Sequence, residues 1–349
     1  MTCTYGSYRN PVSHSFIEAA QGLGIPYNED YNGARADDVG WLQFSIRMGQ
    51  RCSTAKAYLH PVMGRPNLTV ITGTPCERVT FEGKRATGIV IGGEGGQRVL
   101  TTNREVIPSA GPIISPKILE LSGVGSPELL KKHGIEVRHA LPGVGENLIN
   151  HLHTRFNFRI NKKVTVNNLL ANKLRGAAAM LKYLVTRQGL MAIPSVTAHA
   201  MTKSHDAAPY ADLKLQIAMY TAKDRYLDSS DGLPTDPFSG IGLGQFHIYP
   251  QSRGHVHIKS ADPADYTEMK ANYFSAEGDA EAALAGMRKL REIAHHPAIA
   301  AHIVDETEPA STSIAMPICS RHFLQCHTAG SRPVRDDPLR PTMLSHCFS

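Results

Sequence analysis

Residues 105–125 read EVIPSAGPIISPKILELSGVG, and this stretch decides the fold. Its first part, residues 105–110, has the apolar character of a short buried strand, which ends at Gly111. Because glycine has no side chain, backbone or a ligand can approach closely at that point. Ser115 followed by Pro116 is typical of a helix start, and the helix is expected to run to Leu121. The stretch therefore predicts a strand, a tight turn that could contact a ligand, and a helix.

Other segments extend the pattern along most of the chain. They are RCSTAKAYL at 51–59, RPNLTV at 65–70, LPGVGENLINH at 141–151, SRGHV at 252–256, SADP at 260–263 and NYF at 272–274. Together with residues 111–125, these segments resemble the signatures of the glucose-methanol-choline (GMC) oxidoreductases, with Asn150 where an aspartate is usual. The resemblance can be followed from about Asn10 to about Pro309, and it is strongest to the choline and alcohol dehydrogenases of that family.

The resemblance implies an α/β (α+β) fold. A partial FAD-binding, Rossmann-like domain would be joined to a substrate domain built on an antiparallel sheet with flanking helices. We expect a loop-rich leading segment at 1–50, the partial FAD-binding domain at 51–155, the substrate-binding domain at 156–305 and an atypical, disordered tail at 306–349. Periodicity predicts helices at 11–21, 126–133, 173–187 and 280–294, and strands at 88–91, 97–101, 213–220, 244–249 and 255–259.

The same resemblance implies the chemistry. Members of the family transfer a hydride from the carbon of an alcohol to FAD while a histidine takes the hydroxyl proton. The substrate would be a small alcohol, and the electron acceptor is not identified by the sequence. The catalytic histidine of the family lies in an H-P-x-G-T segment, whose nearest match here is His327 in HTAGSR, without the proline. We take His327 as the candidate catalytic residue.

Candidate FAD contacts also follow from the resemblance. Cys76 stands where the family has a small residue beside the adenine, and Ser109, Ala110 and Gly111 stand where its backbone approaches the adenosine. The alternative is that all four are ordinary strand and turn residues of a core sheet. His151 and His153 lie in the LPGVGENLINH region, where a histidine is more often a surface or supporting group than a catalyst.

One expected element is not found in this sequence. The FAD pyrophosphate of such proteins rests on a strand, a G-x-G-x-x-G turn and a helix N-terminus. Gly22–Gly24, Gly143–Gly145 and Gly242–Gly244 each lack the third glycine at the required spacing. We therefore expect the chain to be a truncated family member that, by itself, binds FAD weakly or not at all. The alternative function is a non-catalytic fragment or relative that is unable to hold FAD.

Two other chemistries are weighed and set aside. Cys319, His322, Cys326 and His327 are residue types that bind zinc, but their spacing is too cramped for a paired tetrahedral site, so no metal site is predicted. Residues 123–127 read GVGSP, which is not the G-x-S-x-G nucleophile turn of a hydrolase.

Composition excludes further classes. The net charge of +6 is spread along 349 residues, and the densest basic spots are the pairs at 131–132 and 162–163, so nucleic-acid binding is not expected. No apolar run reaches the ~18 residues of a membrane-spanning helix. Cys3, Cys52 and Cys76 have no paired spacing, which is typical of a reduced, cytoplasmic protein.

Overall fold

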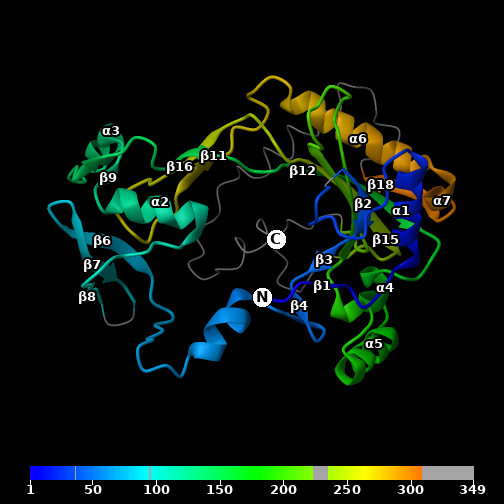
Figure 1. Ribbon diagram of the computed structural model, residues 1–349, viewed down its shortest axis with the longest axis horizontal. Helices are drawn as coiled ribbons and strands as arrows, with labels where there is room; N and C mark the ends of the chain where they lie inside the picture. Colours follow the sequence, from blue (N-terminus) through cyan, green and yellow to red (C-terminus); the bar gives the residue numbers. More distant parts are fainter. Residues whose placement is uncertain (36, 94–95, 223–234, 309–349) are drawn as a thin grey trace.

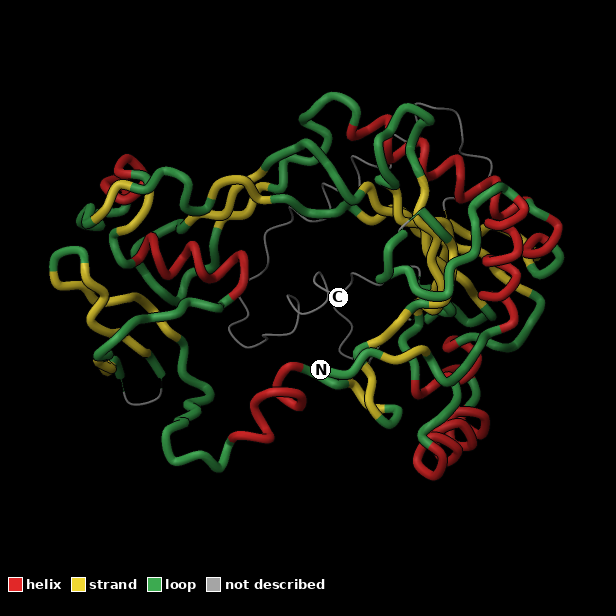
Figure 2. The backbone as a smooth tube through the Cα atoms, viewed as in Figure 1, coloured by secondary structure: helices red, strands yellow, loops and turns green. Residues whose placement is uncertain are grey.

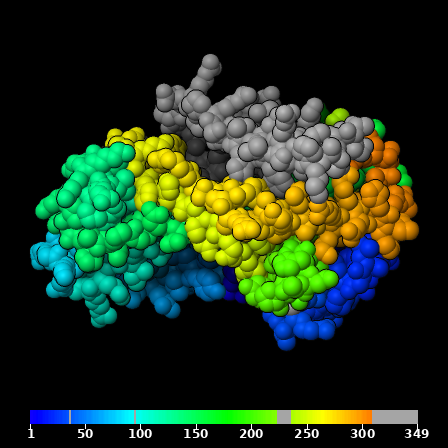
Figure 3. All heavy atoms as spheres, turned by 90° about the horizontal axis from the view of Figure 1, so that it is seen from above, coloured from blue at the N-terminus to red at the C-terminus, as the bar shows by residue number. Residues whose placement is uncertain are grey.

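The computed structural model describes residues 1–35, 37–93, 96–222 and 235–308. These residues form two lobes, one built on a large antiparallel sheet and the other on smaller sheets around α2 (Gly111–Leu121) (Figure 1). Seen from above, the segment around residues 250–275, coloured yellow, runs between the two lobes (Figure 3). None of the helices in these ranges is long and apolar enough to cross a membrane.

The large sheet has six strands in the order β18, β12, β15, β14, β13, β2, and each neighbouring pair is antiparallel. The strands are β2 (Val39–Trp41), β12 (His153–Ile160), β13 (Val196–Thr202), β14 (Leu213–Ala218), β15 (Gly240–His247) and β18 (Ile303–Glu308). The antiparallel sheet expected from the sequence is confirmed, and it draws on residues from 39 to 308.

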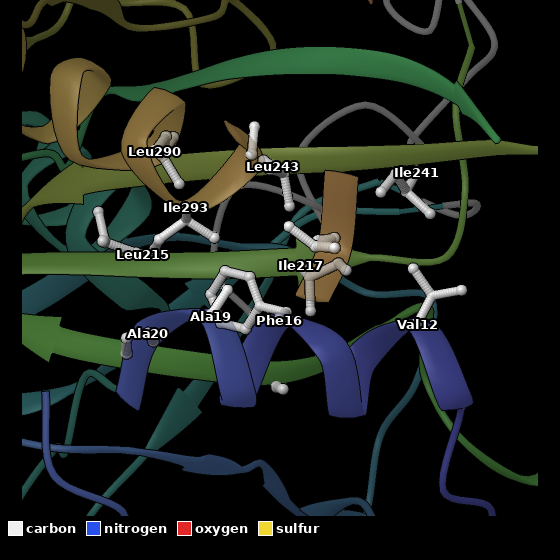
Figure 4. Close-up of a cluster of buried hydrophobic side chains, with 14 of the residues drawn as sticks. Val12, Phe16, Ala19, Ala20, Leu215, Ile217, Ile241, Leu243, Leu290 and Ile293 are labelled. Carbon is white, nitrogen blue, oxygen red and sulfur yellow. The ribbon is translucent and has the colours of Figure 1, made fainter. Parts of the chain in front are cut away.

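Two helices cover one face of this sheet and enclose the core. They are α1 (Pro11–Gly22) and α6 (Asp279–His295), which lie on the outer side of the sheet (Figure 2). Phe16 of α1 and Leu290 of α6 have no exposed surface and pack with Leu215 and Leu243 of the central strands (Figure 4). Apolar residues recur at helical spacing on both helices, so each helix presents one apolar side to the sheet.

The start of α1 is fixed by its cap. The side chain of Asn10 accepts a hydrogen bond from Val12 N at 2.9 Å, and its amide donates to Val164 O at 2.8 Å. Pro11 occupies the first helical position, where no N–H is needed. The cap therefore sets the helix start and also ties it to a segment more than 150 residues away.

The second lobe is built on a three-stranded sheet and α2. The sheet contains β6 (Cys76–Glu82), β7 (Arg85–Ile91) and β8 (Arg98–Thr101) in that order. Ser122, just after α2, accepts a hydrogen bond from Val79 N at 2.8 Å, which holds the end of the helix against β6. The hairpin expected at 88–101 is confirmed for its strands by the pairing of β7 with β8.

A second small sheet lies on the other side of α2. It has the order β11 (Glu146–Leu148), β16 (Gly254–His257), β17 (Glu268–Lys270). Lys117 of α2 donates to Pro263 O at 2.7 Å, next to this sheet.

The remaining elements are β1 (Thr4–Tyr5), β3 (Gln43–Phe44), β4 (Ile46–Arg47), β5 (Gln50–Arg51), η1 (Ala55–Leu59), η2 (His60–Val62), β9 (Val124–Gly125), α3 (Pro127–Lys132), β10 (His139–Ala140), α4 (Val166–Ala171), α5 (Lys173–Thr186), η3 (Leu190–Ala192) and α7 (Pro297–Ala300).

The local expectation at 105–121 needs two corrections. The helix begins at Gly111 rather than Ser115, and Ser115 lies in its second turn, where Oγ accepts a hydrogen bond from Ala110 N at 3.1 Å. The strand expected at 105–110 is wrong, since these residues carry no strand pairing. Pro108 has no N–H to donate, and a strand needs a neighbour for its hydrogen bonds.

The proposed domain limits differ from the lobes in space. Residues 1–50 contribute α1 and β2 to the lobe of the large sheet, whereas residues 254–270 pack beside α2. The domain boundary at residue 155 therefore stays a prediction about the sequence. In space, each lobe contains residues from several of the predicted domains.

Replacing Phe16 by alanine should strongly destabilise the protein. The ring is fully buried against the sheet, so Phe16→Ala removes apolar contacts and leaves a cavity, and the free energy of unfolding should fall by about 3–5 kcal/mol. Leu174→Ala is the control, because Leu174 is 83% exposed and its removal should change stability by less than ~0.5 kcal/mol. Urea unfolding of both variants measures the difference. Equal losses would contradict the assignment of the core.

Candidate functional site

Cys76 opens β6 in the second lobe. It pairs with Ile91 of β7 and is half-buried, and burial, followed by the negative charge of Glu77, raises the pKa of its thiol. A thiol of raised pKa stays protonated at neutral pH and behaves as a small apolar group. That is the character expected for a residue that packs against an adenine, and its contact with FAD stays a prediction.

Ser109, Ala110 and Gly111 lead into α2 on the same lobe and are exposed. Gly111 has a φ of +80°, and an added Cβ would meet no other atom within 4 Å. Glycine is therefore favoured here by the backbone conformation, and the space around it is open. No side chain caps the N-terminus of α2. This turn could accept a polar ligand at its backbone, and its role as an adenosine contact stays a prediction.

A groove of about 370 Å³ lies beside β6. Its walls include Arg78 of β6, Ser122 after α2 and Arg138 before β10. The groove adjoins the strand that Cys76 begins, so the lobe expected to carry the cofactor contacts has both an open turn and a hollowed face.

The candidate catalytic residue, His327, lies outside the described residues. The same is true of Cys319, His322 and Cys326, the other members of the set considered for zinc.

The large sheet presents a polar face opposite its core. Directly opposed residues in neighbouring antiparallel strands share a face. His199 is opposite Gln216, and Gln216 is opposite Gly244. Arg155 is also opposite Gly244, while Lys214 and His153 are both opposite Phe246. We call the following set the polar sheet face: His153, Arg155, His199, Lys214 and Gln216.

Glycines run through the middle of this face. Gly240, Gly242 and Gly244 alternate along β15, so the central strand carries no side chain at these three positions. A Cβ added at Gly244 would lie 2.0 Å from Nε2 of His153, so the imidazole can lie across the strand only because residue 244 is glycine. His153 stacks on Phe246 at 4.5 Å between ring centroids, and its Nε2 is 3.4 Å from the amide nitrogen of Gln216.

His199 is the most unusual group on the polar sheet face. It is 1% exposed and meets the ring of Tyr31 edge-on, with ring centroids 4.2 Å apart. Among the described residues, neither ring nitrogen has a hydrogen-bond partner. Leaving a buried polar group unsatisfied costs about 1–3 kcal/mol, which a bound polar ligand would offset.

Burial also decides the protonation of His199. Desolvation, followed by the positive charge of Lys214, lowers its pKa to about 3. Burial likewise lowers the pKa of the Lys214 ammonium. A neutral imidazole with such a low pKa is a weak general base, but it can donate one hydrogen bond and accept another. His199 is thus suited to orient a hydroxyl group rather than to remove its proton.

The polar sheet face carries groups that would hydrogen-bond or attract a small polar molecule. Lys214 and Arg155 supply positive charge, Gln216 supplies an amide, and the ring of His153 occupies the space that a side chain at Gly244 would take. Arg155 is oriented by a hydrogen bond from its guanidinium to Ala222 O at 3.0 Å. Cations beside a hydroxyl group favour negative charge that develops on its oxygen during a reaction.

A neighbouring carboxylate fixes the SRGHV segment. Asp279, the first residue of α6, accepts hydrogen bonds from Gln251 N and Ser252 N, both at 2.8 Å. His247, at the end of β15, lies 3.7 Å from the same carboxylate and 3.8 Å from that of Asp212. These contacts hold the end of β15 and the segment that leads to β16.

Sequence reasoning missed most of the polar sheet face. It singled out His153 but not His199, Lys214 or Gln216. One available signal was the alternation in LKLQIA, where Lys214 and Gln216 interrupt an apolar strand at every second residue. Whether Lys214 or Gln216 lies opposite a polar residue of a neighbouring strand depends on the register of the strand pair. A single sequence does not determine that register.

Comparison with known proteins places these observations in a family. Residues 2–153 match the sequence model of the N-terminal part of GMC oxidoreductases, and residues 250–332 match that of the C-terminal part. An alcohol dehydrogenase (acceptor) from Pseudomonas putida is 34% identical over 336 residues, which cover 94% of this chain and 60% of the relative. Human mitochondrial choline dehydrogenase is 33% identical, over 88% of this chain and 50% of that protein.

Solved structures agree on the fold. A formate oxidase variant from Aspergillus oryzae superposes with a TM-score of 0.81 at 19% identity, covering 93% of this chain and 60% of that chain. Pyridoxine 4-oxidase has a TM-score of 0.74 at 22% identity, covering 91% and 57%. The chain spans about half to three fifths of the length of these proteins.

Acid should destabilise the protein through His199. Its pKa is about 3 in the folded protein and about 6.5 in the unfolded chain, so between these values the unfolded state binds more protons. The contribution of His199 to stability is therefore complete above pH 6.5 and decreases as the pH falls towards 3, by up to about 1.4 kcal/mol per pH unit. His199→Gln should flatten the dependence of unfolding free energy on pH, whereas Leu174→Ala, at an exposed residue that does not titrate, should retain it. The measurement is urea unfolding between pH 4 and 8. A slope retained in His199→Gln would contradict the assignment.

Proposed function

This chain belongs to the GMC oxidoreductase family, and we propose that it acts in the FAD-dependent oxidation of the CH–OH group of an alcohol. The observation that carries the proposal is the polar sheet face, where the buried His199 lacks a hydrogen-bond partner within the described residues. A substrate hydroxyl supplies what that imidazole lacks. The alcohol dehydrogenase and choline dehydrogenase names of the relatives favour alcohols as the substrate class.

The residues fit FAD at its adenosine end. Cys76 would pack beside the adenine, and the backbone of Ser109, Ala110 and Gly111 would approach the adenosine. The open space around Gly111 is consistent with this role. FAD, when bound, supplies the acceptor for the hydride that leaves the alcohol carbon.

The polar sheet face would bind and orient the alcohol. The amide of Gln216 and the imidazole of His199 would hydrogen-bond the hydroxyl oxygen, and the positive charges of Lys214 and Arg155 would favour negative charge on it as its proton leaves. The proton acceptor is proposed to be His327, on the resemblance of HTAGSR to the catalytic segment of the family. Loss of a hydride from carbon and a proton from oxygen converts the alcohol to a carbonyl compound.

We propose the cellular location and the partners of this reaction from the composition of the chain. Cys3, Cys52 and Cys76 are free thiols, which is consistent with the reducing cytoplasm. The partners are then a small alcohol and an electron acceptor of unspecified kind, without nucleic acid.

The alternative is a non-catalytic relative that does not hold FAD. The sequence observation in its favour is that no G-x-G-x-x-G turn occurs in these 349 residues. The experiment that distinguishes the two functions uses the protein produced from the complete gene, including any residues that the gene encodes on either side of this sequence. Under the proposed function it should purify with flavin, and anaerobic addition of an alcohol should bleach the visible flavin band. A colourless protein that takes up no FAD would establish the alternative.

The polar sheet face can be tested in the same preparation. Gln216→Leu should raise the alcohol KM or slow the bleaching by at least about tenfold, because a buried hydrogen bond to the substrate is lost. The control is Arg288→Ala, at an exposed position of α6, which should bleach as the parent does. Unchanged bleaching in Gln216→Leu, with normal flavin content, would remove this face from the site.

The 349-residue chain expressed by itself should bind FAD weakly and oxidise no alcohol. Contacts at Cys76 and at Ser109 to Gly111 reach only the adenosine end, and the helix N-terminus that would hold the pyrophosphate is not supplied by this sequence. Gel filtration after incubation with FAD measures retained flavin, and anaerobic addition of alcohol measures activity. Stable yellow colour with bleaching would contradict this expectation, and His327→Ala would then test whether that histidine takes the proton.

A further inference from the structure

Three metal-binding side chains meet in the small sheet beside α2, away from the polar sheet face. They are Glu146 of β11 and His255 and His257 of β16, and their ligand atoms all lie within 4.8 Å of one another. Both histidines are partly exposed and Glu146 is exposed, so an ion could reach them from solvent. Glu146 and His255 lie in two of the signature segments, LPGVGENLINH and SRGHV, but the proposed alcohol chemistry assigns no role to this cluster.

The backbone holds the cluster together. Glu146 is directly opposite His255 in the β11–β16 pair, and His255 and His257 share a face because they are two residues apart on one strand. Gly145 lets the strands approach closely: its φ is +82°, and an added Cβ would lie 2.3 Å from Val256 O and 2.6 Å from Nδ1 of His257. The side chains are thus brought together by strand pairing rather than by a mobile loop.

A buried carboxylate orients His257. Nδ1 of the imidazole lies 2.7 Å from Oε1 of Glu120, which has no exposed surface, and Ile258 N donates to the other oxygen of Glu120 at 2.9 Å. With Nδ1 donating its proton to Glu120, the lone pair of Nε2 points towards Oε1 of Glu146, 3.0 Å away. Two acceptors facing each other need a cation between them, either a proton on Nε2 or a metal ion. Carboxylates placed in this way behind a histidine are typical of zinc sites.

The charges around the cluster leave two carboxylates on His257. Glu268 is opposite His257 in β17, and it forms an ion pair of 2.8 Å with Lys270, which is opposite His255. Glu120 and Glu146 are then the carboxylates that face the imidazole of His257 directly. Their negative charges favour a divalent cation at Nε2 of His257. The ammonium group of Lys270 does not supply that charge, because it is paired with Glu268.

We propose that Glu146, His255 and His257 bind a zinc ion, with Glu120 as the positioning residue behind His257. Two imidazole nitrogens and one carboxylate oxygen form a donor set that suits Zn²⁺, and the fourth tetrahedral position is left for water. Bonds of about 2.0–2.1 Å place two ligand atoms about 3.3 Å apart in a tetrahedron, and Nε2 of His257 and Oε1 of Glu146 are already close to that separation. His255 completes the site by a rotation of its partly exposed side chain. The ion would join β11 to β16.

The test uses the 349-residue chain freed of metal with EDTA and titrated with Zn²⁺ in a calorimeter. Although the spacing of Cys319, His322, Cys326 and His327 does not suit a tetrahedral site, cysteine and histidine are residue types that bind zinc. Every protein in the series therefore carries Cys319→Ser and Cys326→Ser. In that background, one Zn²⁺ should bind per chain and should raise the thermal unfolding temperature. Co²⁺ in its place should give the visible absorption of a tetrahedral complex without a thiolate charge-transfer band.

The variants decide which residues bind the ion. His255→Ala and Glu146→Gln should each weaken Zn²⁺ binding by at least about tenfold and abolish the rise in unfolding temperature, while His139→Ala, at an exposed histidine of the same lobe, should bind as the parent does. His257→Gln is a secondary variant, because it also leaves the buried Glu120 with an altered partner. Failure of the chain with Cys319→Ser and Cys326→Ser to bind Zn²⁺, or unchanged affinity in both His255→Ala and Glu146→Gln, would overturn the proposal and leave a proton on His257 as the bridging charge.

Discussion

The constraint on which the structure depends is the alternation of side chains along the strands of the large sheet. Leu213, Leu215 and Ile217 of β14 point to the helices and are fully buried, so the residues between them must point the other way. Apolar burial of one set therefore fixes the place of Lys214 and Gln216 on the opposite face. A slip of one residue would put the cation into the core and the leucines on the polar side, at a cost that no local interaction could offset. The same strand thus builds the core and presents the candidate site.

The second lobe depends on a different kind of contact, a carboxylate removed from water. Glu120 is buried on α2, and its two oxygens are taken by the His257 ring and by the backbone of Ile258. A buried carboxylate is tolerated only when it is fully hydrogen-bonded, so helix and strand specify each other's position. Because α2 also holds β6 through Ser122, this one helix connects the sheet of Cys76 with the sheet of the proposed zinc site. Residues 111–122 therefore organise the lobe physically as well as identifying the family.

Local elements could be predicted from the sequence, while their assembly could not. The helices near 11–21, 173–187 and 280–294 and the strand near 213–220 follow from periodicity and are found with shifts of a few residues at their ends. The pairing of β2 with β13 and of β12 with β18 joins residues about 150 apart, and nothing local specifies it. His199 stands in VTAHAMT, a run of small and apolar residues that resembles an ordinary core strand. The prediction of a strand at 105–110 was wrong because apolar character alone does not supply a neighbouring strand to pair with.

Three histidines show how far residue type falls short of specifying a role. His153 lies across a glycine, stacks on Phe246 and has Nε2 3.4 Å from the amide nitrogen of Gln216, so its neighbours fix the position of its ring. Burial beside Lys214 keeps His199 neutral, which allows it to hydrogen-bond a hydroxyl but makes it a poor acceptor of the proton. Burial alone would lower the pKa of His257, but hydrogen bonds to Glu120 and Glu146 raise it overall, so that ring favours a positive partner, either a proton or a metal. The proton acceptor of an alcohol oxidation must be basic enough to accept a proton and must be close to the substrate, and neither His199 nor His257 meets both requirements. The proposed base is therefore another residue, His327, as the resemblance of its segment implies, while the polar sheet face is proposed to bind and polarise the substrate.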